Sequence, residues 1–458
     1  MAAAFPGKVR MSSTTSIGSM AVPTVKATRV RYAILGLLFL VTAINYADRA
    51  TLSIAGTALA RELNFDPIGM GYLFSAFGWA YVIGQIPGGW LLDRYGSKLI
   101  YGLSLFSWSL FTLLQGGVGF FHPTSAFMML FAVRFALGLV ESPAFPANNR
   151  IVAAWFPTAE RGTATAIFNS AQYAAVAFFA PIMGWITASF GWEYIFLFMG
   201  ALGILLSLAW PWLIHNPKDH PRANAAEIEH LEKGGALVDM DRAGAAPPVK
   251  IRWAHVKQLL SHRLLLGAYA GQYAITALTY FFITWFPIYL VQARGMSIMK
   301  VGFVAALPAI CGFLGGVCSG MLSDALLRRG ISLSAARKTP FVIGMALATT
   351  LVACNVVAAE WAVIAIMALA FFGKGLAAIG WAVISDAAPR EITGLTGGMF
   401  NAIGNIAGIV TPIVSGYIIV ATGSYDGVLV FVAAHAVLAI LAYLFLMGPI
   451  HRLTLRQA

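Results

Sequence analysis

Long apolar stretches separated by short polar segments run along almost the whole chain. They fall at 32–58, 68–91, 98–118, 125–148, 162–187, 193–214, 264–291, 299–322, 339–358, 361–385, 394–421 and 427–448. Each stretch approaches or exceeds the ~20 mostly apolar residues that a helix needs to cross a bilayer. The pattern therefore predicts an all-α integral membrane protein with twelve transmembrane helices in two groups of six.

A polar connector, residues 215–263, separates two predicted six-helix bundles at 31–214 and 264–449. The connector holds eight of the thirty Lys and Arg residues and six of the eighteen acidic ones, so we expect it to be solvated. One short helix is expected within it, around Ala226–Glu232. Residues 1–30 are basic and rich in Ser, Thr and Ala, which predicts a disordered cytoplasmic tail, and 450–458 form a second cytoplasmic tail.

The two bundles repeat one another in sequence. Gly71 is matched by Gly302 and Pro181 by Pro412, each 231 positions later, and Asn169 is matched by Asn401 after 232 positions. A shift that is constant to one residue indicates a duplicated unit. Six-helix halves arranged around a site near the bilayer midplane are typical of transporters.

Composition and charge placement support this interpretation. The chain is 59% hydrophobic and 10% charged, with a mean hydropathy of +0.78, whereas soluble domains carry about 25% charged residues. A water-soluble enzyme is thereby excluded. Under an orientation with the N-terminus inside, sixteen Lys and Arg residues fall in short cytoplasmic segments and three, Arg61, Arg294 and Lys300, fall in outer loops. Basic residues are retained on the cytoplasmic face, so the net charge of +12 reflects topology, and no nucleic-acid partner is expected.

Five charged residues lie inside the predicted spans: Asp48, Arg49, Arg134, Glu141 and Lys374. Intramembrane charges are costly and usually functional. Three cations against two acids leave an excess positive charge in the core, which favours an anionic ligand. No pair of histidines has metal-ligand spacing and the cysteines lie in apolar stretches, so neither a metal nor a disulfide framework is expected.

The spacing of these charges suggests their partners. Asp48 and Arg49 are adjacent and so point in different directions from their helix. Arg134 and Glu141 are seven residues apart, about 10 Å of helical rise, too far for a tight pair, and each is expected to find a partner on the first helix. We expect an Asp48–Arg134 ion pair whose breakage couples proton binding to movement; the alternative is a static salt bridge.

The cations and several polar side chains within the predicted spans are candidates for substrate binding. A guanidinium grips a carboxylate with two parallel hydrogen bonds, so Arg49 is expected to bind a substrate carboxylate, with Arg134 second. Lys374 would meet the second carboxylate of a diacid, unless it snorkels to one face of the membrane. Hydroxyl-binding candidates are Tyr46, Tyr81, Gln172, Tyr280, Asn401 and Asn405, each of which could equally make a helix–helix hydrogen bond.

The loop Asp93-Arg94-Tyr95-Gly96-Ser97-Lys98 resembles the cytoplasmic signature of the major facilitator superfamily. Three further segments, Asn45–Ala50, Phe74–Tyr81 and Gln85–Trp90, resemble its anion:cation symporter branch, and within it bacterial D-glucarate/D-galactarate and D-galactonate transporters. The resemblance covers residues 31 to 448. It implies gating by Asp93, Arg94, Gly96 and Lys98 at the helix ends.

The resemblance also implies roles for residues in the core. Asp48 and Glu141 match the proton-coupling acids of the family, and Arg49, Tyr81, Gln172, Trp381, Ser385 and Asn401 match its binding residues. The glycine-rich helix-5 pattern of many antiporters in the superfamily is degraded here to Ala180-Pro181-Ile182-Met183-Gly184, which favours a symporter.

The expected function is therefore import of a sugar acid, D-glucarate or D-galactarate, by proton symport through alternating access. The chain is expected to act as a monomer across a bacterial inner membrane, with the proton as coupling ion and no cofactor. Alternatives are uptake of a hexonate or hexuronate monoacid, efflux of an organic anion or drug, or a membrane enzyme or sensor. Short, nearly uncharged outer loops and the lack of an additional soluble domain argue against the last class.

Overall fold

The computed structural model describes residues 26–158, 160–240, 253–389 and 392–455, and within these ranges every regular element is a helix. The N-terminal group consists of α1 (Val30–Glu62), α2 (Pro67–Tyr95), α3 (Ser97–Gln115), α4 (Pro123–Glu141), α5 (Ala144–Trp155), α6 (Arg161–Phe190) and α7 (Glu193–Leu213). The C-terminal group consists of α10 (Arg263–Thr284), α11 (Phe286–Gln292), α12 (Ile298–Arg328), α13 (Leu333–Ala348), α14 (Glu360–Leu376), α15 (Gly380–Ala387), α16 (Thr393–Asn405), α17 (Ala407–Thr422) and α18 (Asp426–Leu441). Each of the twelve predicted stretches overlaps one of these helices or a consecutive pair, and the stretch 339–358 continues from α13 into a 3-10 helix, Thr349–Asn355.

Ten helices in the described ranges are long and apolar enough to cross a membrane, or eleven if α10 and α11, bent by 46°, form one span. The predicted stretch that falls short is α2. It has 29 residues, but its many glycine, tyrosine and tryptophan residues lower its mean hydropathy. The membrane character of the chain is therefore clear, while a count of twelve spans requires both α2 and the bent pair α10–α11.

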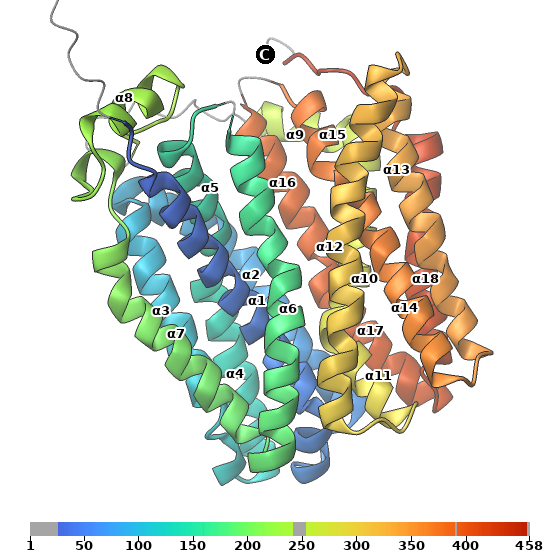
Figure 1. The fold of residues 1–458 in the computed structure, drawn as a ribbon. Coiled ribbons are helices and arrows are strands. Elements are labelled where there is room, and N and C mark those ends of the chain that lie inside the picture. Colours follow the sequence, from blue (N-terminus) through green and yellow to red (C-terminus); the bar gives the residue numbers. More distant parts are fainter. Residues whose placement is uncertain (1–25, 159, 241–252, 390–391, 456–458) are drawn as a thin grey trace, which may run out of the picture.

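The two groups lie side by side along their length (Figure 1). Within the N-terminal group α1 packs on α6, α2 on α4 and α3 on α7; within the C-terminal group α14 packs on α12 and α13, and α10 on α18. The groups meet mainly where α6 contacts α12 and where α2 contacts α17. Two pairs of helices thus hold the groups together.

Close backbone packing between the groups gathers at one end of the molecule. A Cβ built on Gly71, near the start of α2, would lie 2.7 Å from the carbonyl oxygen of Pro412 in α17. A Cβ built on Gly302, near the start of α12, would lie 2.6 Å from the carbonyl oxygen of Ala180 in α6. Only glycine permits such an approach, because any side chain would overlap the opposite backbone.

The connector is anchored to the opposite end, where α1 begins. The expected short helix is confirmed as α8 (Ala225–Lys233). Its Glu227 is fully buried and accepts hydrogen bonds from the Thr28 hydroxyl at 2.5 Å and from the backbone N–H groups of Val30 and Arg31 at 3.1 and 3.2 Å. This part of the connector is therefore docked on the N-terminal group.

A second connector helix, α9 (Trp253–Ser261), was not expected from the sequence. The Gln258 side-chain amide donates to the carbonyl oxygen of Thr454 at 2.9 Å, so α9 contacts the chain that follows α18. Residues 241–252 of the predicted solvated connector, 1–25 of the predicted disordered tail and 456–458 of the C-terminal tail lie outside the described residues.

Candidate functional site

Arg49 and Glu141 form an ion pair between α1 and α4 in the interior of the N-terminal group. The Arg49 Nε donates to Glu141 Oε1 at 2.7 Å, and Nη2 contacts the same oxygen. The Glu141 side chain is fully buried, and the Arg49 side chain is 11% exposed. The expectation that Glu141 finds its partner on the first helix is confirmed, and that partner is Arg49.

Aromatic rings surround the same guanidinium. The Arg49 Cζ lies 4.7 Å from the ring centroids of Tyr46 and Phe77 and 4.9 Å from that of Tyr81. Ring faces attract a cation most strongly where water is excluded. Arg49 is thus held by one carboxylate and three rings.

Asp48 faces a different direction from its neighbour Arg49. It is fully buried, and neither carboxylate oxygen has a hydrogen-bond partner among the described residues. Trp108 of α3 lies beside it, with an indole N–H that likewise has no partner within hydrogen-bond distance. Burying a charged carboxylate that has no hydrogen-bond donor is costly.

The expected Asp48–Arg134 ion pair is not formed in the described structure. The Arg134 Nε donates to the carbonyl oxygen of Leu73 at 3.1 Å, and Nη1 donates to Gln115 Oε1 at 3.3 Å. The residue spacing correctly separated Asp48 from Arg49 on α1, but it did not show which face of α1 meets α4. Arg49 occupies that face, so Arg134 is satisfied by neutral acceptors.

Lys374 of α14 contacts the N-terminal group. It is 3% exposed, and its Nζ lies 3.3 Å from the Tyr173 hydroxyl of α6. The ammonium also lies 4.9 Å from the Tyr173 ring centroid and 5.0 Å from that of Phe371. No carboxylate forms an ion pair with it in the described ranges. The alternative of a lysine that snorkels to a membrane face does not fit this burial.

Tyr173 is a residue that the sequence reasoning missed, although it directly follows Gln172. A tyrosine in the middle of an apolar stretch was the available signal, and the same signal identified Tyr46 and Tyr81. Gln172 itself donates from Nε2 to the carbonyl oxygen of Asn169 at 3.0 Å, within its own helix. In this structure Tyr173, and not Gln172, therefore contacts Lys374 of the other group.

Three of the hydroxyl-binding candidates come together in the C-terminal group. The Tyr280 hydroxyl donates to Asn405 Oδ1 at 3.4 Å, and Asn405 Nδ2 donates to the Asn401 carbonyl oxygen at 2.9 Å. Tyr280 is 6% exposed and lies within the electrostatic field of Arg49 in the other group. These amides and the hydroxyl can bind polar groups of a ligand.

Trp381 and Ser385 of α15 lie apart from these contacts. Trp381 is 41% exposed and packs edge-on against Phe400, with ring centroids 5.0 Å apart. Ser385 is exposed, and its carbonyl oxygen accepts a hydrogen bond from Arg452 Nη2 at 2.9 Å. In the described ranges no hydrogen bond, ion pair or ring contact joins either residue to Arg49 or Lys374.

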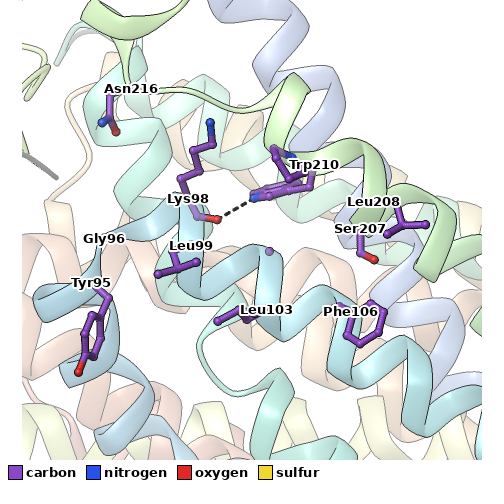
Figure 2. A pocket seen from close by; sticks show the side chains of 12 residues that line it. Tyr95, Gly96, Lys98, Leu99, Leu103, Phe106, Ser207, Leu208, Trp210 and Asn216 are labelled. Carbon is purple, nitrogen blue, oxygen red and sulfur yellow. Dashed lines mark hydrogen bonds between the residues drawn. The ribbon is translucent and has the colours of Figure 1, made fainter.

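The signature loop joins α2 to α3 and pairs with α5. Asp93 forms an ion pair with Arg150, a residue that the sequence reasoning did not assign to the gate. Gly96 has φ +82°, a left-handed conformation that favours glycine. Arg94 lies over the Trp90 and Tyr95 rings at 5.4 and 5.5 Å. Lys98 lines a slot between α3 and α7 (Figure 2).

The arrangement places a cation from each group in the interior, Arg49 from one and Lys374 from the other, with tyrosines beside both. Such a set suits an anion with polar substituents. In the described ranges no three His, Cys, Asp or Glu side chains gather in a way that could hold a metal ion.

Comparison with known proteins identifies relatives over nearly the full length. The family model described as "Major Facilitator Superfamily" matches residues 38–336. The "Probable galactarate/D-glucarate transporter GudP" of Bacillus subtilis (strain 168) is 58% identical over 435 residues, 95% of this chain and 96% of that protein. The "D-galactonate transporter" of Escherichia coli O6:H1 is 39% identical over 431 residues, 93% and 98% of the two chains.

Among solved structures, a bacterial homologue of the human lysosomal transporter Spinster has a similar fold. The TM-score is 0.67 at 17% identity, covering 91% of this chain and 98% of that one. At this identity the likeness concerns the fold alone.

Proposed function

Because this chain belongs to the Major Facilitator Superfamily, we propose that it is a secondary active transporter that imports D-glucarate or D-galactarate together with protons. The relative named for these two diacids is 58% identical, whereas the one named for the monoacid D-galactonate is 39% identical. The difference favours a diacid. The buried charges of Lys374, Arg49, Glu141 and Asp48 support the same assignment.

The observation that carries the proposal is the buried ammonium of Lys374, which has hydroxyl and ring contacts but no carboxylate partner among the residues that the structure describes. A buried cation without a counter-charge is costly. A substrate carboxylate would supply that charge. Arg49 would hold the other carboxylate with the paired donors of its guanidinium. The two cations belong to different groups, so a diacid would connect the two halves of the transporter.

The proton would enter through Glu141 and Asp48. In the described structure the Glu141 carboxylate pairs with the Arg49 guanidinium, so a substrate carboxylate must compete with Glu141 for Arg49. Protonation of Glu141 would release Arg49 for the substrate, which makes proton and anion binding mutually favourable. Such reciprocity is a coupling free energy between two sites. Asp48, whose oxygens have no donors, would carry a second proton.

We place all twelve predicted helices across the membrane, α2 included, with both termini in the cytoplasm. α1 ends at Glu62 and α2 begins at Pro67, so the chain reverses direction there, and α2 packs on α4 and α17. A spanning α2 keeps the two six-helix halves equivalent, as the repeat requires. The chain is then a multi-pass protein of the cytoplasmic membrane.

The packing of Gly71 and Gly302 would close the outer end, as an inward-facing or occluded state requires. Transport would proceed as the two halves rock about the central cations and open this end. The loop with Asp93, Arg94, Gly96 and Lys98 lies at the other end. Its Asp93–Arg150 pair joins α2 to α5 and would move with the N-terminal half.

Uptake of labelled D-glucarate into proteoliposomes, with and without an inward proton gradient, tests the proposal. We expect gradient-driven accumulation that galactarate competes with better than galactonate or glucuronate. Accumulation without dependence on the proton gradient would refute proton symport. Competition by monoacids alone would replace the diacid by a hexonate or hexuronate, the second candidate, which the 39% identical relative supports.

A further inference from the structure

A slot of about 450 Å³ opens between α3 and α7, away from the central cations (Figure 2). Leu99 and Leu103 from α3 and Leu208 from α7 line it and are 53%, 54% and 56% exposed. Such leucines face the hydrocarbon of a membrane rather than the protein interior. The slot is therefore accessible from the bilayer.

The Trp210 ring forms the floor of the slot and is held in place by contacts with α3. The Trp210 indole N–H donates to the carbonyl oxygen of Lys98 at 2.8 Å, which fixes the ring against α3. A Cβ on Gly102 would lie 2.7 Å from the indole Cδ1, so the lack of a side chain there lets the ring approach the helix closely. A preformed slot needs less ordering when a ligand binds.

One end of the slot carries the basic side chain of Lys98, and Asn216 Nδ2 at the same end donates to Asp219 Oδ2 at 3.2 Å. Lys98 lines it beside Asn216 and makes no ion pair in the described part of the chain. His215 and His220 lie within the electrostatic field of Lys98, and Asp219 is the acidic neighbour that opposes it. Burial lowers the pKa of both histidines, so Lys98 supplies most of the positive charge at neutral pH.

We propose that this slot binds an anionic phospholipid, with its phosphate at Lys98 and Asn216 and one acyl chain along the leucines. Basic pockets between transmembrane helices on the cytoplasmic side recognise anionic headgroups. From Leu99 to Phe106 the slot follows α3 for seven residues, about 10 Å of helical rise, enough to hold the upper part of an acyl chain. The lipid would contact the same loop that carries Asp93.

Native mass spectrometry of the full-length, delipidated protein tests the site. It is titrated with dioleoyl-phosphatidylglycerol or dioleoyl-phosphatidylcholine, and the bound lipid is counted. We expect one phosphatidylglycerol to bind about fivefold more tightly than phosphatidylcholine, because a basic side chain near an anionic surface contributes ~1 kcal/mol. Lys98→Gln should abolish this preference and Lys98→Arg should keep it.

Two further variants separate the slot from general lipid binding. Leu103→Trp should fill the slot and weaken the binding of both lipids. Arg329 is exposed and occupies the position equivalent to Lys98 in the second repeat, so Arg329→Gln should leave the preference for phosphatidylglycerol unchanged. Equal binding of the two lipids, or equal loss in Lys98→Gln and Arg329→Gln, would overturn the proposal. So would displacement of the lipid by inorganic phosphate alone. The assay contains no sugar acid, so its outcome is independent of the proposed transport.

Discussion

Gly71 and Gly302, which occupy equivalent positions in the two repeats, each pack against the backbone of the opposite group at the same end of the molecule. Gly71 meets Pro412, and Gly302 meets Ala180 and Pro181. Since Pro181 and Pro412 are also repeat equivalents, the closed end has an approximate twofold relation. The duplicated sequence thus forms the same contact twice.

Replacing either glycine should prevent this end from closing. A leucine at Gly71 or Gly302 would overlap backbone atoms, which cannot move aside as a side chain can, and overpacking of this kind costs ~1–3 kcal/mol. We expect the initial uptake rate in proteoliposomes to fall by about fivefold or more for a closure free energy raised by that amount. Gly36→Leu, where no atom lies within 4 Å of a Cβ, is the matched control. Normal uptake by both the Gly71→Leu and the Gly302→Leu variant would show that closure of this end does not use this contact.

Asp48→Asn should separate proton coupling from substrate movement. Both oxygens of Asp48 are buried without partners, so a neutral amide of the same shape fits the site but cannot exchange a proton. Gradient-driven accumulation is expected to disappear while exchange of external for internal substrate continues. Asp66→Asn serves as a control, because Asp66 accepts from the Gly69 N–H at 2.7 Å as a helix cap and asparagine caps equally well. Full accumulation in Asp48→Asn would remove it from the proton pathway.

Glu141→Gln should make stability depend on substrate. Loss of one member of a buried ion pair destabilises a protein by about 3–5 kcal/mol, because Arg49 would keep its charge without a counter-ion. A substrate carboxylate at Arg49 would restore that charge. The melting temperature in detergent should therefore rise more on adding D-glucarate to this variant than to the unchanged protein. An equal rise in both would mean that substrate does not reach Arg49.

Lys374→Gln should weaken the binding of a diacid more than the binding of a monoacid. A hydrogen bond to a charged group contributes about 1.5–3 kcal/mol, so we expect at least about a tenfold loss in apparent affinity for D-glucarate and little change for galactonate. Tyr173→Phe keeps the ring over the ammonium and removes only the hydroxyl, so it should preserve the discrimination. Competition in the uptake assay measures both. Parallel losses for the two acids would contradict a second carboxylate site at Lys374.

Glu227→Ala should release the connector from the N-terminal group. Glu227 accepts from the backbone at the start of α1 and also pairs with Arg31 at 3.4 Å. Its loss leaves the backbone N–H groups of Val30 and Arg31 without this acceptor, while Arg31 keeps its pair with Glu160 at 3.3 Å, so about 1–3 kcal/mol of stability should be lost. The exposed Glu229, paired with Lys233 at 2.6 Å, is the matched control, since such helix-surface pairs contribute about 0.5 kcal/mol or less. Thermal unfolding of both alanine variants compares them, and similar midpoints would show that the docking contributes little.

Local patterns in the chain determined the helices, the repeat and the identity of the charged residues. Hydrophobic stretches, the short α8 helix and the five intramembrane charges depend on neighbouring residues alone, so they were predictable. α9 was not, because its nine residues carry several polar side chains and no long apolar run. The divergent directions of Asp48 and Arg49 also followed from helical geometry.

The partners of those charges were decided by the tertiary structure. Sequence spacing locates a side chain on its own helix but does not give the rotation of that helix against its neighbours. That rotation placed Arg49, and not Asp48, opposite α4, and it brought Tyr173 to Lys374 across the two groups. The sequence by itself determined which charges enter the membrane, whereas the packing of helices distant in sequence decided which of them meet.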